Sequence, residues 1–328
     1  MRRILFLLML LSSSAFATDK FVTSAKKFLS SLDAKTKEKL MFGFDNGERY
    51  NWNFVPTPRK GASLHDLTDQ QRKDLEELLA VFLSEQGFTK ATTVPKWEAI
   101  LREVEGRKEG DEYRDPKKYY VSFFGEPAEK SLWGWRFEGH HLSLNFTYFN
   151  GVVEGSTPSF MGANPAVAPS GARNLKDETD LAFALVNSLN RDQQKVAIFS
   201  DKALPEIVTG NARDAKSLDP KGIHYAALTE DQQKAFIRLL NVFVKNYELG
   251  FSSKLWEKIQ KAGVDNLSFA WAGSTTPGTG TYYRIQGPTL LIEYDNTQTN
   301  NNHVHTAVRD LTNDWAGDIL KEHYKKEH

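Results

Sequence analysis

Two carboxylates and two imidazoles lie close together near the end of this chain. Glu293, Asp295, His303 and His305 fall within thirteen residues, and five Asn or Gln residues stand between the two pairs. On an extended backbone, His303 and His305 share one face of a strand, with their Cα atoms about 7 Å apart. Imidazole and carboxylate groups are common ligands of divalent metal ions, so this spacing favours a metal site.

A second histidine pair, His140 and His141, stands in the first half of the chain. It follows Glu138 and Gly139, which we expect to form the turn of a β-hairpin. Side chains alternate between the two faces of a strand, so only one of the two histidines is expected to join the site. The residues predicted to share its face are His141, Ser143, Asn145 and Thr147.

We assign roles to ten residues on this basis. The predicted metal ligands are His141, His303 and His305. The predicted catalytic residues are Glu293, Asp295, Arg309 and Asp310, and the predicted substrate- or water-binding residues are Asn145, Gln298 and Asn302. Glu293 or Asp295 is expected to act as a ligand or general base. Arg309 is expected to bind an anionic group, and Asp310 to orient Arg309 or a histidine.

Several functions are compatible with this set of residues. Two histidines and a carboxylate suit Zn²⁺, Mn²⁺, Fe²⁺ or Cu²⁺, and the sequence does not choose among them. A metal-dependent hydrolase acting on a small molecule is the preferred interpretation, with a metal-dependent oxidoreductase as the rival within enzymes. A metal-free acid–base site, a periplasmic protein that binds a small molecule or a metal without catalysis, and purely structural histidines remain alternatives.

The composition excludes several classes of protein. The chain has 328 residues, no cysteine, and equal numbers of basic and acidic residues, 42 each. The lack of cysteine excludes disulfides, a thiolate nucleophile and any Cys-ligated metal site. The balanced charge gives no basic excess for nucleic acid, so no nucleic-acid partner is expected.

The first residues are typical of a secretory signal peptide. Arg2 and Arg3 precede an eight-residue apolar run, Ile4–Leu11, and a small-residue cleavage site that ends at Ala17. The run is too short to span a bilayer, which needs about 20 apolar residues, and no later segment is long and apolar enough. We therefore expect cleavage after Ala17, no membrane span, and a periplasmic or secreted protein.

The chain contains one pattern twice, in the same order. The aligned segment pairs are Ala25–Phe42 with Ala182–Phe199, Leu67–Leu83 with Leu228–Val244, and Trp133–Tyr148 with Thr281–Asn296. The first two pairs predict helices, with N-caps at Asp33, Asn190, Thr68 and Thr229. The third pair predicts a β-hairpin in each half. This repetition predicts an internal duplication, with pseudo-repeats at residues 18–172 and 173–328 after the signal peptide at 1–17.

We therefore expect an α+β fold in which each half has helices followed by an antiparallel hairpin. The two hairpins either form a shared antiparallel sheet or pack against each other. Residues 155–171 are rich in Pro, Gly and Ser, which predicts an irregular connection between the halves. Its central part, Phe160–Pro165, is expected to cover the site.

Five segments together resemble a bacterial family described as domain of unknown function 3500. The segments are Trp133–Asn145, Phe160–Pro165, Ser188–Gln194, Gly287–Gln298 and Asn302–Asp310. The resemblance covers nearly all of the chain after the signal peptide. It implies no substrate, because the family has no assigned activity. It implies that the Gly-His-His and Asn-His-x-His segments are hallmarks of the family, which favours one shared site.

Overall fold

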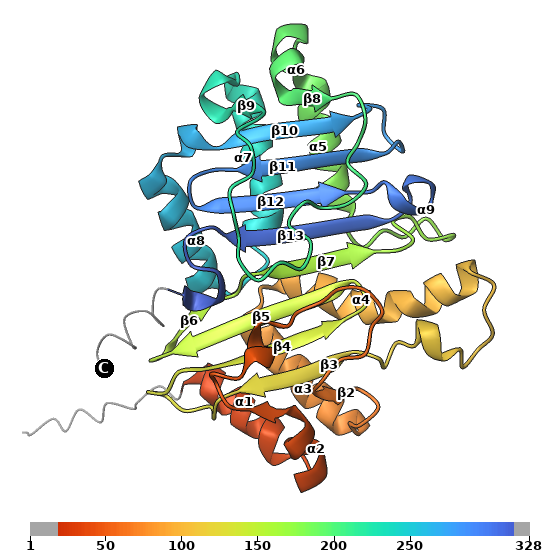
Figure 1. Ribbon diagram of the computed structural model, residues 1–328, viewed down its shortest axis with the longest axis vertical. Coiled ribbons are helices and arrows are strands. Elements are labelled where there is room, and N and C mark those ends of the chain that lie inside the picture. The colour runs from red at the N-terminus through yellow and green to blue at the C-terminus, as the bar shows by residue number, and fades with distance from the viewer. Residues whose placement is uncertain (1–18, 318–328) are drawn as a thin grey trace, which may run out of the picture.

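The computed structural model describes residues 19–317, which form a mixed α+β fold around one sheet of thirteen strands (Figure 1). Helices cover one face of the sheet, and two long loops, one from each half of the chain, cross the other face (Figure 1). We call these the helix face and the loop face. The predicted signal peptide, residues 1–17, lies outside the described residues.

The strands of the sheet are mostly short. Their bounds are β1 (Met41–Phe42), β2 (Ala62–Ser63), β3 (Tyr120–Phe124), β4 (Trp133–Gly139), β5 (Leu142–Phe149), β6 (Val152–Gly155), β7 (Ser159–Ala163), β8 (Ile198–Ser200), β9 (Ile223–His224), β10 (Ser268–Gly273), β11 (Thr281–Gln286), β12 (Leu290–Asp295) and β13 (Val304–Asp310). Most neighbouring strands are antiparallel, and the pairs β1–β3 and β8–β10 are parallel.

Residues 19–317 contain nine α-helices. Their bounds are α1 (Lys20–Ser30), α2 (Ala34–Leu40), α3 (Asp69–Phe82), α4 (Glu85–Val104), α5 (Lys176–Ser188), α6 (Arg191–Ala197), α7 (Glu230–Val244), α8 (Leu249–Ala262) and α9 (Gln298–Asn301). Short 3₁₀ turns are η1 (Gly47–Tyr50), η2 (Glu112–Arg114), η3 (Tyr225–Ala227), η4 (Val264–Asn266) and η5 (Asp314–Ala316).

Four helices begin at the residues that the sequence predicted as N-caps. Thr68 before α3 and Thr229 before α7 each form a capping box with the Gln three residues later. Asp33 caps α2 and Asn190 caps α6 through side-chain oxygens that accept backbone N–H groups. These local bonds satisfy donors that a helix leaves unpaired at its start, so short polar residues fix the boundaries.

The strand order has the same succession on both sides of its centre. The order is β1-β3-β4-β5-β7-β13-β12-β11-β10-β8, with β2 beside β3, β6 beside β5 and β9 beside β10. Both predicted hairpins, β4–β5 and β11–β12, are antiparallel pairs within this single sheet. The antiparallel pair β7–β13 joins the two sides, so the ends of β5 and β13 lie near each other at the centre.

The two faces of the sheet differ in polarity. On the helix face, Phe82 of α3 packs against Trp133, Trp135 and Phe146, with ring centroids 5.1–6.0 Å apart. On the loop face, buried charged side chains bind the loops. Arg136, for example, donates to Glu48 at 2.9 Å. Because buried charges need partners, the loops that cross this face supply them.

Two sequence-based expectations about the centre of the sheet were wrong. Residues 159–163 form strand β7 between β5 and β13, so Phe160–Pro165 does not cover the site as a loop. The strand was missed because it has only five residues and is flanked by Pro158 and Pro165. The first hairpin turns at His140 and His141, since Gly139 is still paired with Leu142.

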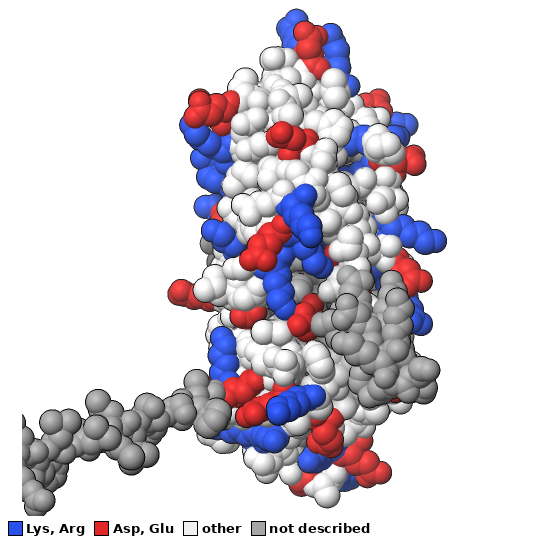
Figure 2. All heavy atoms as spheres, turned by 90° about the vertical axis from the view of Figure 1, so that its left-hand side faces the viewer, with Lys and Arg blue, Asp and Glu red and all other residues white. Residues whose placement is uncertain are grey.

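Charged side chains of both signs are distributed over the surface. Figure 2 shows Lys and Arg interspersed with Asp and Glu on one side of the molecule. Within residues 19–317, no helix is long and apolar enough to cross a membrane.

Candidate metal centre

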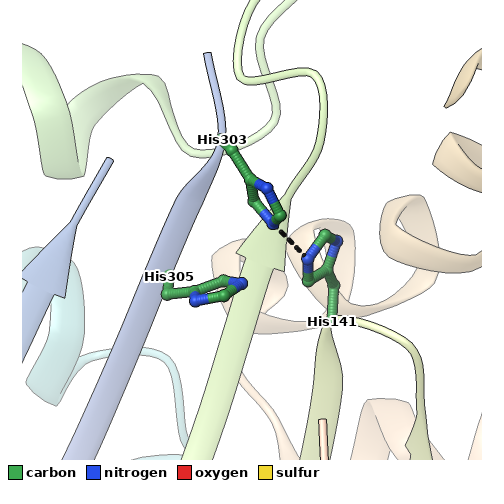
Figure 3. A group of neighbouring side chains, drawn as sticks. All are labelled: His141, His303 and His305. Carbon is green, nitrogen blue, oxygen red and sulfur yellow. Dashed lines mark hydrogen bonds between the residues drawn. The ribbon is translucent and has the colours of Figure 1, made fainter. Parts of the chain in front are cut away.

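Three buried histidine side chains meet at the centre of the sheet. Nε2 of His141 lies 2.7 Å from Nε2 of His303, and the ring of His305 is centred 5.1 and 4.6 Å from these two rings. Figure 3 shows the three rings turned toward one another. One nitrogen of each ring can be chosen so that all three lie within 4.8 Å of one another.

The tight turn between β4 and β5 places His141. Its φ is 61°, its N–H donates to the carbonyl of Phe54 at 2.8 Å, and its carbonyl accepts from Gly162 at 2.8 Å. A Cβ on Gly162 would lie 2.9 Å from Cδ2 of His141 and 2.9 Å from the carbonyl oxygen of Val304. The glycine in β7 therefore leaves the room that the imidazole ring occupies.

A left-handed turn leads the chain into His303. Thr299, Asn300 and Asn301 have φ values of 50°, 53° and 65°, which are uncommon for residues other than glycine. The turn brings Oγ1 of Thr299 to 3.3 Å from Nδ1 of His303. Strand β13 follows, and its alternation places His305 on the same face. The Asn-rich segment thus orients the His-x-His pair.

His305 is oriented by a carboxylate on a distant loop. Its Nδ1 lies 2.7 and 2.9 Å from the two carboxylate oxygens of Glu206, which belongs to the loop between β8 and β9. An ionised carboxylate only accepts hydrogen bonds, so Nδ1 carries the proton of this contact, and Nε2 is the nitrogen that faces the other two histidines (Figure 3). A carboxylate that holds the far nitrogen of a histidine is the usual support for a metal ligand.

Burial keeps two of the histidines neutral. Burial, with neighbouring His140 as the next cause, lowers the pKa of His141 well below its ordinary value. Burial lowers the pKa of His303 to about 3, with His305 as the next cause. Both rings are therefore neutral near pH 7, which is the form that binds a metal ion.

The carboxylates beside His305 have opposite pKa shifts. Burial raises the pKa of Asp295 to about 9, and the nearby charge of Glu206 adds to the effect. Burial alone would raise the pKa of Glu206, but its hydrogen bond with His305 leaves that pKa below the ordinary value. One negative charge and one proton are thus shared over this pair at neutral pH.

The histidine cluster fits a metal ion with little movement. Zn–N bonds of about 2.0–2.1 Å place tetrahedral ligand nitrogens about 3.3 Å apart. The 2.7 Å contact between His141 and His303 needs a proton between two nitrogens, and a cation can replace that proton after a small opening. One nitrogen from each of three imidazoles would leave a fourth position for water or substrate.

A second pair of titratable groups borders the centre. Nδ1 of His140 lies 2.5 Å from Glu98 of α4, and the His140 ring stacks on His141 with centroids 3.7 Å apart. Arg114 lies 3.4 Å from the same Nδ1. Glu98 and His140 line a pocket of about 460 Å³ that also includes Tyr120. The pocket thus reaches His140, whose ring stacks on His141.

Comparison with known protein families matches residues 14–317 to the family described as Protein of unknown function (DUF3500). The chain belongs to this family. No curated protein and no solved structure matches it. The DUF3500 match includes all five segments on which the sequence resemblance rests. The three histidines, Gly162 and Glu206 also lie inside the matched region.

The structure places the predicted catalytic residues apart from one another. Asp295 lies beside His305, with Oδ2 3.7 Å from Nδ1. Glu293 accepts from the backbone of Val208 and Thr209 and from Tyr282, so it anchors the loop that carries Glu206. Both carboxylate oxygens of Glu293 accept these hydrogen bonds, so its contacts are those of a structural anchor rather than those of a general base.

Arg309 and Asp310 do not reach the histidines. Arg309 donates to Asp314 at 2.6 Å and to the carbonyls of Ala212 and Arg213. Asp310, the next residue of β13, is paired with Lys258 of α8 at 2.6 Å. Because successive strand residues face opposite sides, these two residues hold structures on different faces of the sheet.

The predicted polar residues bind neighbouring loops. Asn302 pairs with the backbone of Val167 in both directions, and Asn145 donates to the carbonyl of Pro158. Gln298 donates to Glu206 at 3.0 Å, so it supports the centre indirectly.

Sequence reasoning missed Glu206 and Glu98. Glu206 lies 99 residues from His305 on a loop, and no periodic pattern predicts where a loop crosses a sheet. Glu98 lies on a helix, where a carboxylate is ordinary. For Gly162 a signal existed, because it lies in the Phe160–Pro165 segment that supports the family resemblance.

Proposed function

We propose that this protein is an exported, metal-dependent hydrolase. Its divalent ion would be held by His141, His303 and His305, and its substrate would be a small molecule. The observation that carries the proposal is the convergence of three buried imidazoles with Glu206 fixing the third. Zinc suits three nitrogen ligands and hydrolysis, and Mn²⁺, Fe²⁺ and Cu²⁺ are compatible with the same donors.

The residues around the centre have distinct tasks in this proposal. A bound zinc ion would supply a water whose pKa is about 7, and hence a nucleophile at neutral pH. Glu206 holds the ring of His305, and Thr299 holds that of His303. The pair Glu98–His140 lies between the pocket and His141, where it can hold a proton close to an arriving substrate.

A metal-binding protein without catalysis is the second candidate. The observation that favours it is burial, because the three histidines are only 3%, 9% and 4% exposed. A closed site would bind the ion for transport or stability and would need no route for substrate. The pocket that includes His140 favours the enzyme.

Export and duplication are further parts of the proposal. The basic and apolar residues before Ala17 support export with cleavage at that point, and N-terminal sequencing of the protein from a bacterial periplasm or medium tests it. The matching strand order on both sides of β7–β13 supports descent from a duplicated unit, with halves at 18–172 and 173–328.

The test uses metal-free protein that is then given one metal at a time. Hydrolysis of chromogenic carboxylic and phosphate esters should appear with metal, disappear with chelator, and fall at least 100-fold in His303→Ala. His224→Ala is the matched control, because His224 is exposed and remote in sequence from the centre. Equal activity in His303→Ala and His224→Ala would contradict the hydrolase proposal.

A further inference from the structure

The side of His305 that faces away from the other histidines has its own set of donors. Nδ1 of His305, one oxygen of Glu206 and one oxygen of Asp295 all lie within 4.8 Å of one another. Nδ1 is 2.7 Å from Glu206 and 3.7 Å from Oδ2 of Asp295. Two carboxylates therefore converge on the nitrogen that the first metal site leaves unused.

One of these oxygens is buried without a partner. Asp295 is fully buried, and its Oδ1 accepts from the N–H of Thr297, whose hydroxyl oxygen lies 3.3 Å from the same Oδ1. Its Oδ2 accepts no hydrogen bond from a nitrogen or hydroxyl donor, and it faces the carboxyl group of Glu206. A buried oxygen without a partner costs about 1–3 kcal/mol, so such atoms are rare unless a ligand completes them.

The surrounding charges favour a cation at this position. Across residues 19–317, no lysine or arginine forms an ion pair with Glu206 or Asp295. The donor group on the other side of the centre, Glu98 with His140, already has Arg114 at 3.4 Å. Within residues 19–317, His305 itself is therefore the only cationic partner within ion-pair distance of Glu206 or Asp295.

Glu206 is held in place from several directions. Gln298 donates to its carboxylate at 3.0 Å, and Thr297 donates to the carbonyl of Pro205, the preceding residue, at 3.1 Å. Glu293 binds the backbone of Val208 and Thr209 just after it. These contacts fix the loop where the carboxylate of Glu206 meets Asp295. The position of the Glu206 carboxylate is therefore set by hydrogen bonds on both sides of it in the chain.

We propose that Glu206, Asp295 and Nδ1 of His305 form a second site for a divalent transition-metal ion, joined to the first through the imidazole ring of His305. This site rests on the proposed first centre, because the two share that ring. The Nδ1 proton of His305 and the proton that Glu206 and Asp295 share at neutral pH both leave to the solvent when the second ion binds. The pair of ions then lies on opposite edges of one imidazolate, with nitrogen ligands on one side and carboxylates on the other.

Metal stoichiometry tests the second site. Metal-free full-length protein is titrated with Zn²⁺ alone, and the bound metal is measured after desalting. Wild type should bind two ions, whereas Asp295→Asn should bind one. Asp192→Asn is the matched control, because the side chain of Asp192 is 90% exposed, and it should bind two. Thermal melting checks that each variant is folded.

Copper gives a readout that does not depend on a variant. Two Cu²⁺ ions bridged by one imidazolate couple magnetically, so the electron paramagnetic resonance signal of the loaded wild type should be much weaker than two isolated ions give. Glu206→Gln and Asp295→Asn should restore the full signal of one isolated ion per chain. A full signal from two isolated ions in wild type would overturn the bridge.

The outcomes separate the second site from the first. One ion in both wild type and Asp295→Asn overturns the second site and leaves the proposed metal centre standing. Two ions in both proteins overturn the assignment to Asp295. No bound ion in wild type overturns both proposals.

Discussion

His141 and His303 are separated by 162 residues in sequence, and their Nε2 atoms are 2.7 Å apart. The contact joins the turn of one hairpin to the start of the last strand, across the centre of the sheet. Both rings are buried and neutral, so neither could be held there by ordinary ion pairing. The order of the strands in the sheet therefore assembles the centre. The first half of the chain supplies His141, and the second half supplies His303 and His305.

The first prediction concerns the space beside His141. Gly162→Ala should lower metal affinity 10- to 100-fold and the free energy of unfolding by about 1–3 kcal/mol, because the new Cβ meets the ring and a backbone carbonyl. Gly43→Ala is the control, since nothing lies within 4 Å of its added Cβ. Calorimetric titration and urea unfolding measure both quantities. Unchanged metal affinity in Gly162→Ala would show that the position of His141 does not matter.

The second prediction separates an anchor from a general base at Glu293. Glu293→Gln should lower the free energy of unfolding by about 2–4 kcal/mol, because backbone donors of Val208 and Thr209 lose a charged acceptor. The exposed Glu257→Gln is the control and should change stability little. Full stability with complete loss of hydrolysis would favour the general-base role instead.

The third prediction follows from the raised pKa of Asp295, which is about 9 in the folded protein against an ordinary value of 3.8. Between these values the folded state binds more protons, so wild-type stability falls as pH rises. Asp295→Asn removes this effect. In metal-free protein its stability gain over wild type should grow between pH 5 and pH 8, by up to about 1.4 kcal/mol per pH unit. A gain that does not vary with pH would contradict the prediction.

The fourth prediction follows from the lowered pKa of His303, which is about 3 in the folded protein against an ordinary value of 6.5. Below pH 6.5 the unfolded state binds a proton that the folded state excludes, so stability is lost as pH falls toward 3. In metal-free His303→Gln this loss should be shallower by up to about 1.4 kcal/mol per pH unit between pH 6 and pH 4. His224→Gln is the control, and urea unfolding at each pH gives the comparison. Parallel pH curves for wild type and His303→Gln would show that His303 is not buried in neutral form.

Local signals in the sequence were enough to predict many of the helix boundaries. The N-caps at Thr68 and Thr229 depend on bonds within four residues, so their residue types determine them. Strand β7 was missed because its place in the sheet depends on pairing with β13, about 145 residues away, rather than on its own composition. Non-local pairing of this kind leaves no periodic pattern in a five-residue segment.

The centre was predictable only in part for the same reason. His303 and His305 are two residues apart, and strand geometry alone predicts that they share a face. Glu206 and Gly162 act on the histidines from a loop and a neighbouring strand, so only the assembled sheet reveals them. The metal-ligand roles of the three histidines stay a prediction.

Metal binding by purified mature protein tests the central claim most directly. Zn²⁺ affinity is measured by calorimetry and bound metal by elemental analysis, for wild type, His141→Ala, His303→Ala, His305→Ala and the exposed control His224→Ala. We predict that wild type and the control bind tightly and that each of the three centre variants loses at least 100-fold in affinity. Equal affinity in all five proteins, or less than a tenth of an ion per chain in wild type, would contradict the account.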